Sequence, residues 1–228
     1  GSEMCIRDSS GYRLQLIFIA EKTGTRRNNM KIIGITGGVG AGKSCVLAAL
    51  KKMCNCDIVM ADDVARQIME KGGILTAKAY ELFGENAYNE DGTLNKELLS
   101  GVIYNNPSVK KRWELAVHPA TNAKIKELIL EADAKGRDYI FIEAALLIEN
   151  NYDKICDEIW YLYADEATRR ERLLTERGYS EEKIKTIFKD QLKDDEFRKH
   201  CSFVINTGGS FEDTAGQLQN KLEEYKKL

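Results

Sequence analysis

Gly37-Gly38-Val39-Gly40-Ala41-Gly42-Lys43-Ser44 matches the pattern G-x-x-x-x-G-K-[ST] in full. An apolar run at 31–36 (KIIGIT) precedes it and predicts a buried parallel strand, and apolar positions at helical spacing follow it over 42–53. In this context the glycines let backbone N–H groups surround phosphate oxygens, and the helix N-terminus adds its positive dipole end. A glycine-rich turn without nucleotide is the alternative that this context disfavours. The segment predicts a nucleoside triphosphate site without naming a reaction.

Strand and helix patterns alternate along the rest of the chain, which predicts βαβ units and a parallel sheet. The segment between the second and third strands is too long for one crossover helix, so we expect a helical subdomain over the carboxyl ends of the strands. Asn106-Pro107 is typical of a helix start, Ser210 with Asp213 of a capping box, and His118-Pro119 predicts a helix junction. The predicted strands are 31–36, 58–60, 139–142, 159–163 and 203–205, and the later helices are 166–176, 180–193 and 211–227.

Composition limits the class of protein. The 228 residues are 43% hydrophobic and 31% charged, which suits one domain with a real core, or one such domain with a sizeable insertion. No apolar run approaches the roughly 18 residues of a membrane span. The 34 basic and 36 acidic residues argue against a dedicated nucleic-acid coat, so an anionic ligand must be met by local cations or backbone N–H groups. Residues 1–29 are interpreted as a tag or non-native extension, and 30–228 as the folded domain.

The six cysteines include no C-x-x-C pair, and Cys54-Asn55-Cys56 is too tight for zinc-knuckle spacing. They are interpreted as reduced thiols of a cytoplasmic protein. Cys45 is the candidate for a redox-sensitive thiol because it directly follows the glycine-rich segment.

Two carboxylates follow the second predicted strand. Asp62 or Asp63 is expected either to accept a proton from an attacking hydroxyl, to hold Mg²⁺ through water, or to cap the next helix. Arg66 is either a helical partner of Asp62 or a ligand of a substrate phosphate. By position alone these alternatives stay open.

Other candidates are similarly open. Glu143 follows the third strand, where it is either near a metal or simply a charged residue at a strand end. Arg169, Arg170 and Arg172 form a basic cluster that either binds phosphate or is a solvated helix face. By spacing alone, His118 is more typical of a structural or capping histidine than of a catalytic one.

Four segments in this order resemble the dephospho-CoA kinase family: ITGGVGAGKS (35–44), ADDVARQ (61–67), VHPA (117–120) and EAALLIEN (143–150). The resemblance implies an α/β, P-loop NTPase-type three-layer fold with a five-stranded parallel sheet. It also implies a helical CoA-accepting subdomain at 62–135 and a small helical lid at 165–195. The implied reaction moves the γ-phosphate of ATP to the 3′-hydroxyl of the dephospho-CoA ribose, the last step of coenzyme A synthesis.

The resemblance also implies roles for single residues. Catalytic roles fall on Asp62, Lys43 and Arg172, and the metal ligand is Ser44, with ATP and Mg²⁺ as cofactors. We expect a cytoplasmic monomer or weak homo-oligomer that binds small molecules and neither nucleic acid nor membrane. The ATP-binding residues are Gly38, Val39, Gly40, Ala41, Gly42, Lys43, Ser44, Cys45 and Arg172, and the substrate-binding residues are Asp62, Arg66, His118, Glu143 and Leu146.

Several positions depart from the family pattern. Met60 stands where an aspartate is usual, Ala145 where a proline is usual, and Arg169 where a glutamine is frequent. Thr207 replaces a common asparagine near the adenine. Competing interpretations are another P-loop small-molecule kinase, a non-catalytic nucleotide-binding module, and a GTP switch. The switch is disfavoured because Asn95-Lys96-Glu97-Leu98 fails the Asn-Lys-x-Asp motif at its last position.

Overall fold

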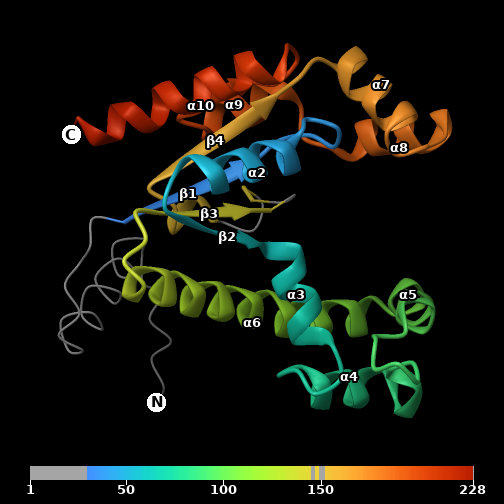
Figure 1. The fold of residues 1–228 in the computed structure, drawn as a ribbon. Helices are drawn as coiled ribbons and strands as arrows, with labels where there is room; N and C mark the ends of the chain where they lie inside the picture. Colours follow the sequence, from blue (N-terminus) through green and yellow to red (C-terminus); the bar gives the residue numbers. More distant parts are fainter. Residues whose placement is uncertain (1–29, 145–146, 149–151, 228) are drawn as a thin grey trace. The chain divides into compact units, whose positions relative to one another are not determined.

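The computed structural model describes residues 30–144, 147–148 and 152–227, and its centre is a five-stranded sheet (Figure 1). The strand order is β2-β3-β1-β4-β5, and β1 pairs in parallel with both β3 and β4, as β4 does with β5. The predicted α/β fold with a five-stranded parallel sheet is confirmed. The strands are β1 (Lys31–Thr36), β2 (Cys56–Met60), β3 (Tyr139–Glu143), β4 (Glu158–Tyr163) and β5 (Phe203–Asn206).

The described chain divides into two compact units. One unit holds the residues up to Ile58 and those from Ala132 onward, and the other holds Val59–Glu131. The first contains most of the sheet with η2 (Tyr152–Lys154), α2 (Lys43–Met53), α7 (Glu166–Thr175), α8 (Glu181–Asp190), α9 (Asp194–His200) and α10 (Phe211–Lys226). The second contains α3 (Ala61–Met69), α4 (Thr76–Phe83), η1 (Glu85–Ala87), α5 (Lys96–Asn105) and most of α6 (Pro107–Ala134).

In the first unit, α10 and α9 cover opposite faces of β4. The ring of Trp160 stacks on Tyr225 of α10, and the ring of Tyr161 stacks on Phe197 of α9 at 4.8 Å. Consecutive side chains of a strand point to opposite faces, so these two contacts place one helix on each side. Burial in this packing raises the pKa of Tyr161 above its ordinary value. The strand β4 is thus covered on both faces, as is typical of a strand in a parallel sheet.

Two helix boundaries differ from the sequence prediction. The single helix predicted at 180–193 ends at Asp190, because Gln191 takes an extended conformation (φ −86°, ψ 153°), and Asp194–His200 forms the separate helix α9. The capping box of Ser210 and Asp213 at the start of α10 is confirmed.

In the second unit, the predicted junction at His118-Pro119 is wrong, since α6 continues through Pro119. A proline inside a helix leaves the carbonyl four residues earlier without its N–H donor. That carbonyl belongs to Leu115, whose residue is 65% exposed, so water can satisfy it. Trp113 and Ile125 are buried on either side and keep the helix anchored across the proline. The predicted start at Pro107 is confirmed.

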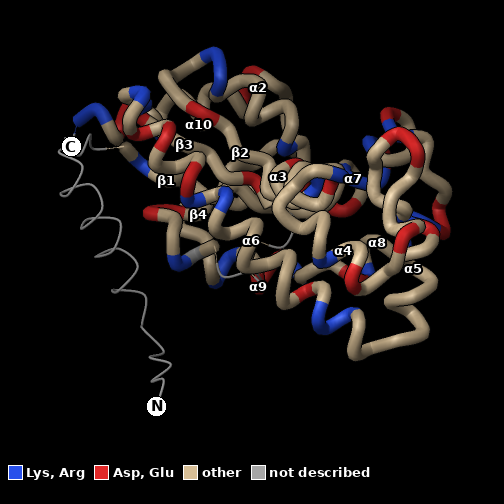
Figure 2. The backbone as a smooth tube through the Cα atoms, turned by 90° about the horizontal axis from the view of Figure 1, so that it is seen from below, with Lys and Arg blue, Asp and Glu red and all other residues tan. Residues whose placement is uncertain are grey.

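The second unit has its own core, in which Phe83 meets Trp113 edge to face at 5.1 Å. Among the described residues, no helix is both long and apolar enough to span a bilayer. Lys and Arg are interspersed with Asp and Glu along the described chain, with no long stripe of one sign (Figure 2).

Candidate active site

The glycine-rich segment forms a tight loop between β1 and α2. The backbone N–H of Ala41 donates to the carbonyl of Gly38 at 3.1 Å, which closes a turn. Gly40 and Gly42 have φ of 85° and 75°, a region that strains any residue with a side chain. Gly42 is the N-cap of α2, so the free N–H groups of the first helical turn begin directly after the loop. This geometry suits an anion such as a phosphate.

Lys43 lies over the loop. Its Nζ donates to the carbonyl of Gly37 at 2.8 Å and approaches that of Gly38 at 3.4 Å. The carboxylate of Glu143 is 3.8 Å from the same nitrogen and is almost fully buried. Glu143 reaches this place because it pairs in register with Ile35, one residue before the end of β1. The structure therefore brings together two of the predicted site residues, Lys43 at the start of α2 and Glu143 at the end of β3.

The donor set here suits a magnesium ion bound largely through phosphates. Ser44 is exposed in the first turn of α2, and Glu143 supplies a carboxylate at the neighbouring strand end. Hydroxyl and carboxylate oxygens are the hard ligands that Mg²⁺ takes, with one or two protein ligands and the rest from substrate and water. Within the described ranges, no three His, Cys, Asp or Glu side chains gather as a metal cage.

Thr207 anchors the loop from the β5 side. Its buried hydroxyl lies 3.0 Å from the carbonyl oxygens of both Ala41 and Tyr163, and its N–H donates to Tyr163 at 2.8 Å. We expected this position near an adenine, and the structure uses its hydroxyl to hold the loop backbone. Spacing could not reveal this contact, because it joins residues 166 positions apart.

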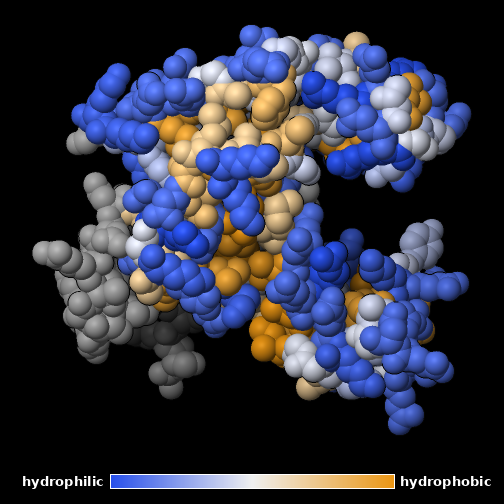
Figure 3. Space-filling model, viewed as in Figure 1, coloured by the Kyte–Doolittle hydropathy of each residue, from blue (hydrophilic) through white to orange (hydrophobic). Residues whose placement is uncertain are grey.

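The arginine cluster of α7 divides between the two alternatives that the sequence left open. Arg172 donates to the carbonyl of Thr207 at 2.6 Å and approaches that of Gly40 at 3.4 Å, so it lies against the loop. Arg169 also contacts the loop. Arg170 instead pairs with Glu181 of α8, both about two-fifths exposed, which fits a solvated helix face. Most of the α7 and α8 surface seen in Figure 3 is hydrophilic.

In the second unit, Asp62 lies in the first turn of α3. The helix begins at Ala61, and in the part of the chain that the structure describes no side chain caps it, so the capping alternative for Asp62 is wrong. Arg66 pairs with Asp63 at 2.9 Å and not with Asp62. Within the same described part, no hydrogen bond or ion pair holds the exposed Asp62 carboxylate. It is available to a ligand.

The structure gives little information about two other residues that were predicted to bind the substrate. His118 is exposed on α6. Leu146, like Ala145, lies outside the described residues.

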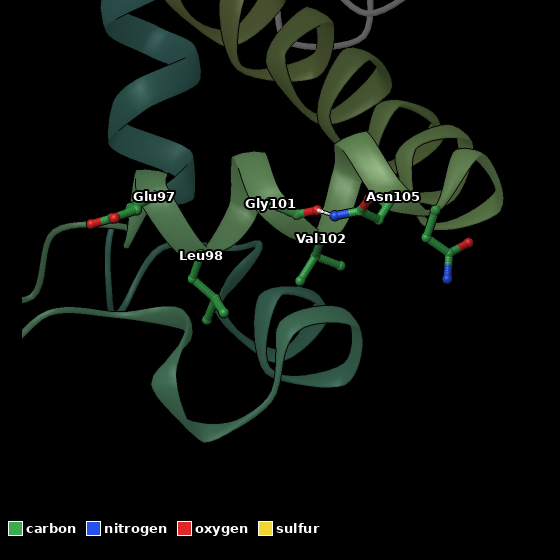
Figure 4. A pocket seen from close by; sticks show the side chains of 6 residues that line it. Glu97, Leu98, Gly101, Val102 and Asn105 are labelled. Carbon is green, nitrogen blue, oxygen red and sulfur yellow. Dashed lines mark hydrogen bonds between the residues drawn. The ribbon is translucent and has the colours of Figure 1, made fainter.

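The second unit also carries an open hollow of about 490 Å³, lined from α5 and its C-cap (Figure 4). Leu98 and Val102 point from α5 toward the neighbouring segments, and the Asn105 side chain folds back to the carbonyl of Gly101 at 2.8 Å. None of the predicted site residues lines this hollow. It is a surface feature with little polar chemistry.

Known proteins match both the sequence and the fold. The sequence model of the dephospho-CoA kinase family matches residues 31–213. A dephospho-CoA kinase of Dehalococcoides mccartyi is 32% identical over 199 residues, covering 87% of this chain and 100% of that protein. One of Shouchella clausii is 30% identical and covers 83% and 96% of the two chains.

Solved structures give the same picture. The crystal structure of TT1252 from Thermus thermophilus is 26% identical with a TM-score of 0.67, covering 86% of this chain and 98% of that one. A dephospho-CoA kinase from Campylobacter jejuni, at 22% identity and a TM-score of 0.64, covers 86% and 97% and shares the fold.

Proposed function

Because the chain belongs to the dephospho-CoA kinase family, we propose that it transfers the γ-phosphoryl group of ATP to the 3′-hydroxyl of the dephospho-CoA ribose. The observation that carries the proposal is the family match over 31–213 together with a complete phosphate loop whose lysine is held beside it. Phosphoryl transfer needs mainly positioning and neutralisation of charge. Both are supplied by the elements around this loop.

The loop residues have a simple role in this proposal. Backbone N–H groups from Gly38 to Cys45 hold the phosphates, and Lys43 exchanges the carbonyls of the loop for the β- and γ-phosphate oxygens. Arg172, fixed by Thr207, adds positive charge beside Gly40. Ser44, with Glu143 nearby, would hold Mg²⁺, which supplies further neutralisation of the phosphate charge when bound.

Asp62 is the proposed general base. Its carboxylate takes the proton of the 3′-hydroxyl, the ribose oxygen forms a bond to the γ-phosphorus, and the bond from that phosphorus to the β,γ-bridging oxygen breaks to release ADP. Its exposure and lack of a partner among the described residues support this role, because a base must be free to reach its substrate. Arg66, His118 and Leu146 are proposed on the acceptor side, with 62–135 as the CoA-accepting subdomain and 165–195 as the lid.

One assay tests the proposed function. The full chain is incubated with ATP and Mg²⁺, and ADP release is measured with dephospho-CoA, with a nucleoside, with shikimate, and without acceptor. We expect ADP release to depend on dephospho-CoA, and mass spectrometry to show a product heavier by one phosphoryl group at the 3′ position. ADP release with another alcohol but not with dephospho-CoA would assign a different kinase activity. ATP binding without turnover on any acceptor would indicate a non-catalytic protein.

A further inference from the structure

The side chain of Arg169 occupies space that the phosphate loop leaves open. A Cβ atom added to Gly38 would come within 1.9 Å of Arg169 Nη1, and one added to Gly40 within 2.9 Å of the Arg169 carbonyl oxygen. The first turn of α7 and the guanidinium therefore pack directly on two glycines of the loop. The small size of Gly38 and Gly40 is what admits this arginine.

Residues at the end of α8 hold the guanidinium in place. Its central carbon lies 4.6 Å from the ring centroid of Phe188, and Nη1 donates to the Gln191 side chain at 3.1 Å. Figure 1 shows α7 and α8 side by side beyond the end of β4. The arginine is thus fixed between the lid helices and the loop.

The charge of Arg169 is not neutralised within the described residues. No carboxylate pairs with it there, and its buried Nε has no hydrogen-bond partner there. Arg170, one residue later, does pair with a carboxylate, that of Glu181. A guanidinium has five N–H donors, and burying unused donors on a cation is costly unless a ligand satisfies them. The ligand that fits a planar cation beside a phosphate loop is an anion with several oxygens.

We infer that Arg169 is a further nucleotide-binding residue of this chain, which donates to the phosphate oxygens. Through its contacts with α8, it couples the position of that helix to the binding of phosphates in the loop. The inference rests on the proposed function and deepens it. Nothing in the resemblance assigns this role, since the family frequently has a glutamine at this position. The cation is a feature of this sequence.

The test measures nucleotide affinity without any acceptor. Titration calorimetry of the full chain gives Kd for ATP, ADP and AMP in Mg²⁺, for the wild type, R169Q, R169K and the matched control R170Q from the same helix. Loss of a charge-assisted contact predicts ATP binding weaker by on the order of tenfold to hundredfold in R169Q. We expect AMP affinity to change little, R169K to lie between, and R170Q to match the wild type.

A double-mutant cycle separates this role from a merely structural one. F188L removes the ring under the guanidinium without touching the loop, so it should weaken ATP binding in the wild type and have no further effect in R169Q. If R169Q lowers the midpoint of thermal unfolding, comparing the effect of F188L in the two backgrounds still tests whether Arg169 binds the nucleotide. An F188L effect that persists in full in R169Q would overturn the inference.

Two other results would overturn it: ATP affinity of R169Q within twofold of the wild type, or tighter ATP binding by R169Q, which would make the guanidinium a latch that competes with nucleotide. Failure of the proposed function looks different. A wild type that binds ATP but does not use dephospho-CoA contradicts that function and leaves the Arg169 result intact, whereas a wild type that binds no ATP overturns both.

Discussion

Asp62 offers the sharpest test among single residues. Asp62→Asn keeps the size of the side chain and removes its basicity, so we expect turnover to fall by about 10²–10⁴-fold. The ATP dissociation constant should stay near the wild-type value, because the loop is unchanged. Steady-state rates and ATP titration on the same preparation measure both quantities. Asp63→Asn, which breaks only the pair with Arg66, is the matched control. Near-normal turnover of the Asp62 variant would remove this carboxylate from the mechanism.

Thr207 tests whether the loop needs its anchor. Thr207→Val keeps the shape and removes the hydroxyl that lies near the Ala41 and Tyr163 carbonyls. Losing such a bond from a buried site costs about 1 kcal/mol or somewhat more. The urea concentration at the unfolding midpoint should therefore fall, and ATP should bind less tightly. Thr207→Ser keeps the hydroxyl and should retain ATP affinity. Equal ATP affinity in the valine and serine variants would show that the hydroxyl does not support the loop.

The cysteines make a further prediction at this scale. Cys45 is exposed in the first turn of α2, whereas burial raises the pKa of the Cys201 thiol to about 12. A thiol reacts as its thiolate, so Cys201 should resist iodoacetamide at pH 8 and become reactive only as the pH rises toward 12. Mass spectrometry should find Cys45 labelled before Cys201, and should find that ATP with Mg²⁺ protects Cys45. Labelling of Cys45 at the same rate with and without nucleotide would place the phosphates elsewhere.

The helix α6 contains Pro119 in its interior, where a proline is tolerated but costs stability. Pro119→Ala restores the missing N–H in an exposed helix interior, so it should raise the free energy of unfolding by roughly 1–3 kcal/mol. Pro107→Ala is the control, because the first helical position has no intrahelical N–H bond to restore. Urea unfolding followed by circular dichroism measures both variants. A Pro119 variant that is less stable than the wild type would mean that the ring makes packing contacts that matter more than the bond.

The elements also show which features of the fold the sequence predicts. The strands were predictable because each is a short apolar run between polar breaks, and the loop because its glycines and lysine follow a fixed pattern. The separation of α8 from α9 was not predictable, since the residues between them include neither glycine nor proline. The helix breaks at Gln191 and Lys193, which both have extended backbones. The continuity of α6 was not predictable either, because it depends on whether the helix face that carries the proline is exposed to water.

The candidate site likewise contains some residues that the sequence predicts and some contacts that it does not. Lys43, Ser44 and the glycines come from one local segment, and Glu143 from a strand end whose position follows from the parallel sheet. The contacts of Arg172 and Thr207 with the loop join residues 132 and 166 positions apart, so spacing alone gave no signal for them. The sequence places Arg169 in the same basic cluster as Arg170. The structure separates them, because Arg169 packs on Gly38 whereas Arg170 pairs with Glu181.

For the whole molecule, the charge balance and the loop must be considered together. The net charge is −2, so the chain as a whole does not attract an anion. Three cations, Lys43, Arg169 and Arg172, nevertheless lie against the loop backbone through hydrogen bonds or close packing. Such a local arrangement makes the affinity depend on the number of phosphates in the ligand more than on long-range attraction.

This dependence predicts how ligands change the stability of the full chain. A ligand that binds only the folded state at about 100 times its Kd adds about 2.7 kcal/mol, which for a chain of this size raises Tm by roughly 5–10 °C. We expect that rise for ATP with Mg²⁺ by scanning calorimetry, a smaller rise with a metal chelator present, and none with adenosine. Lys43→Ala should lose most of it along with activity, because the phosphate charge is then unmatched. If adenosine stabilised the chain as well as ATP does, or if the Lys43 variant responded like the wild type, the loop would not be the nucleotide site.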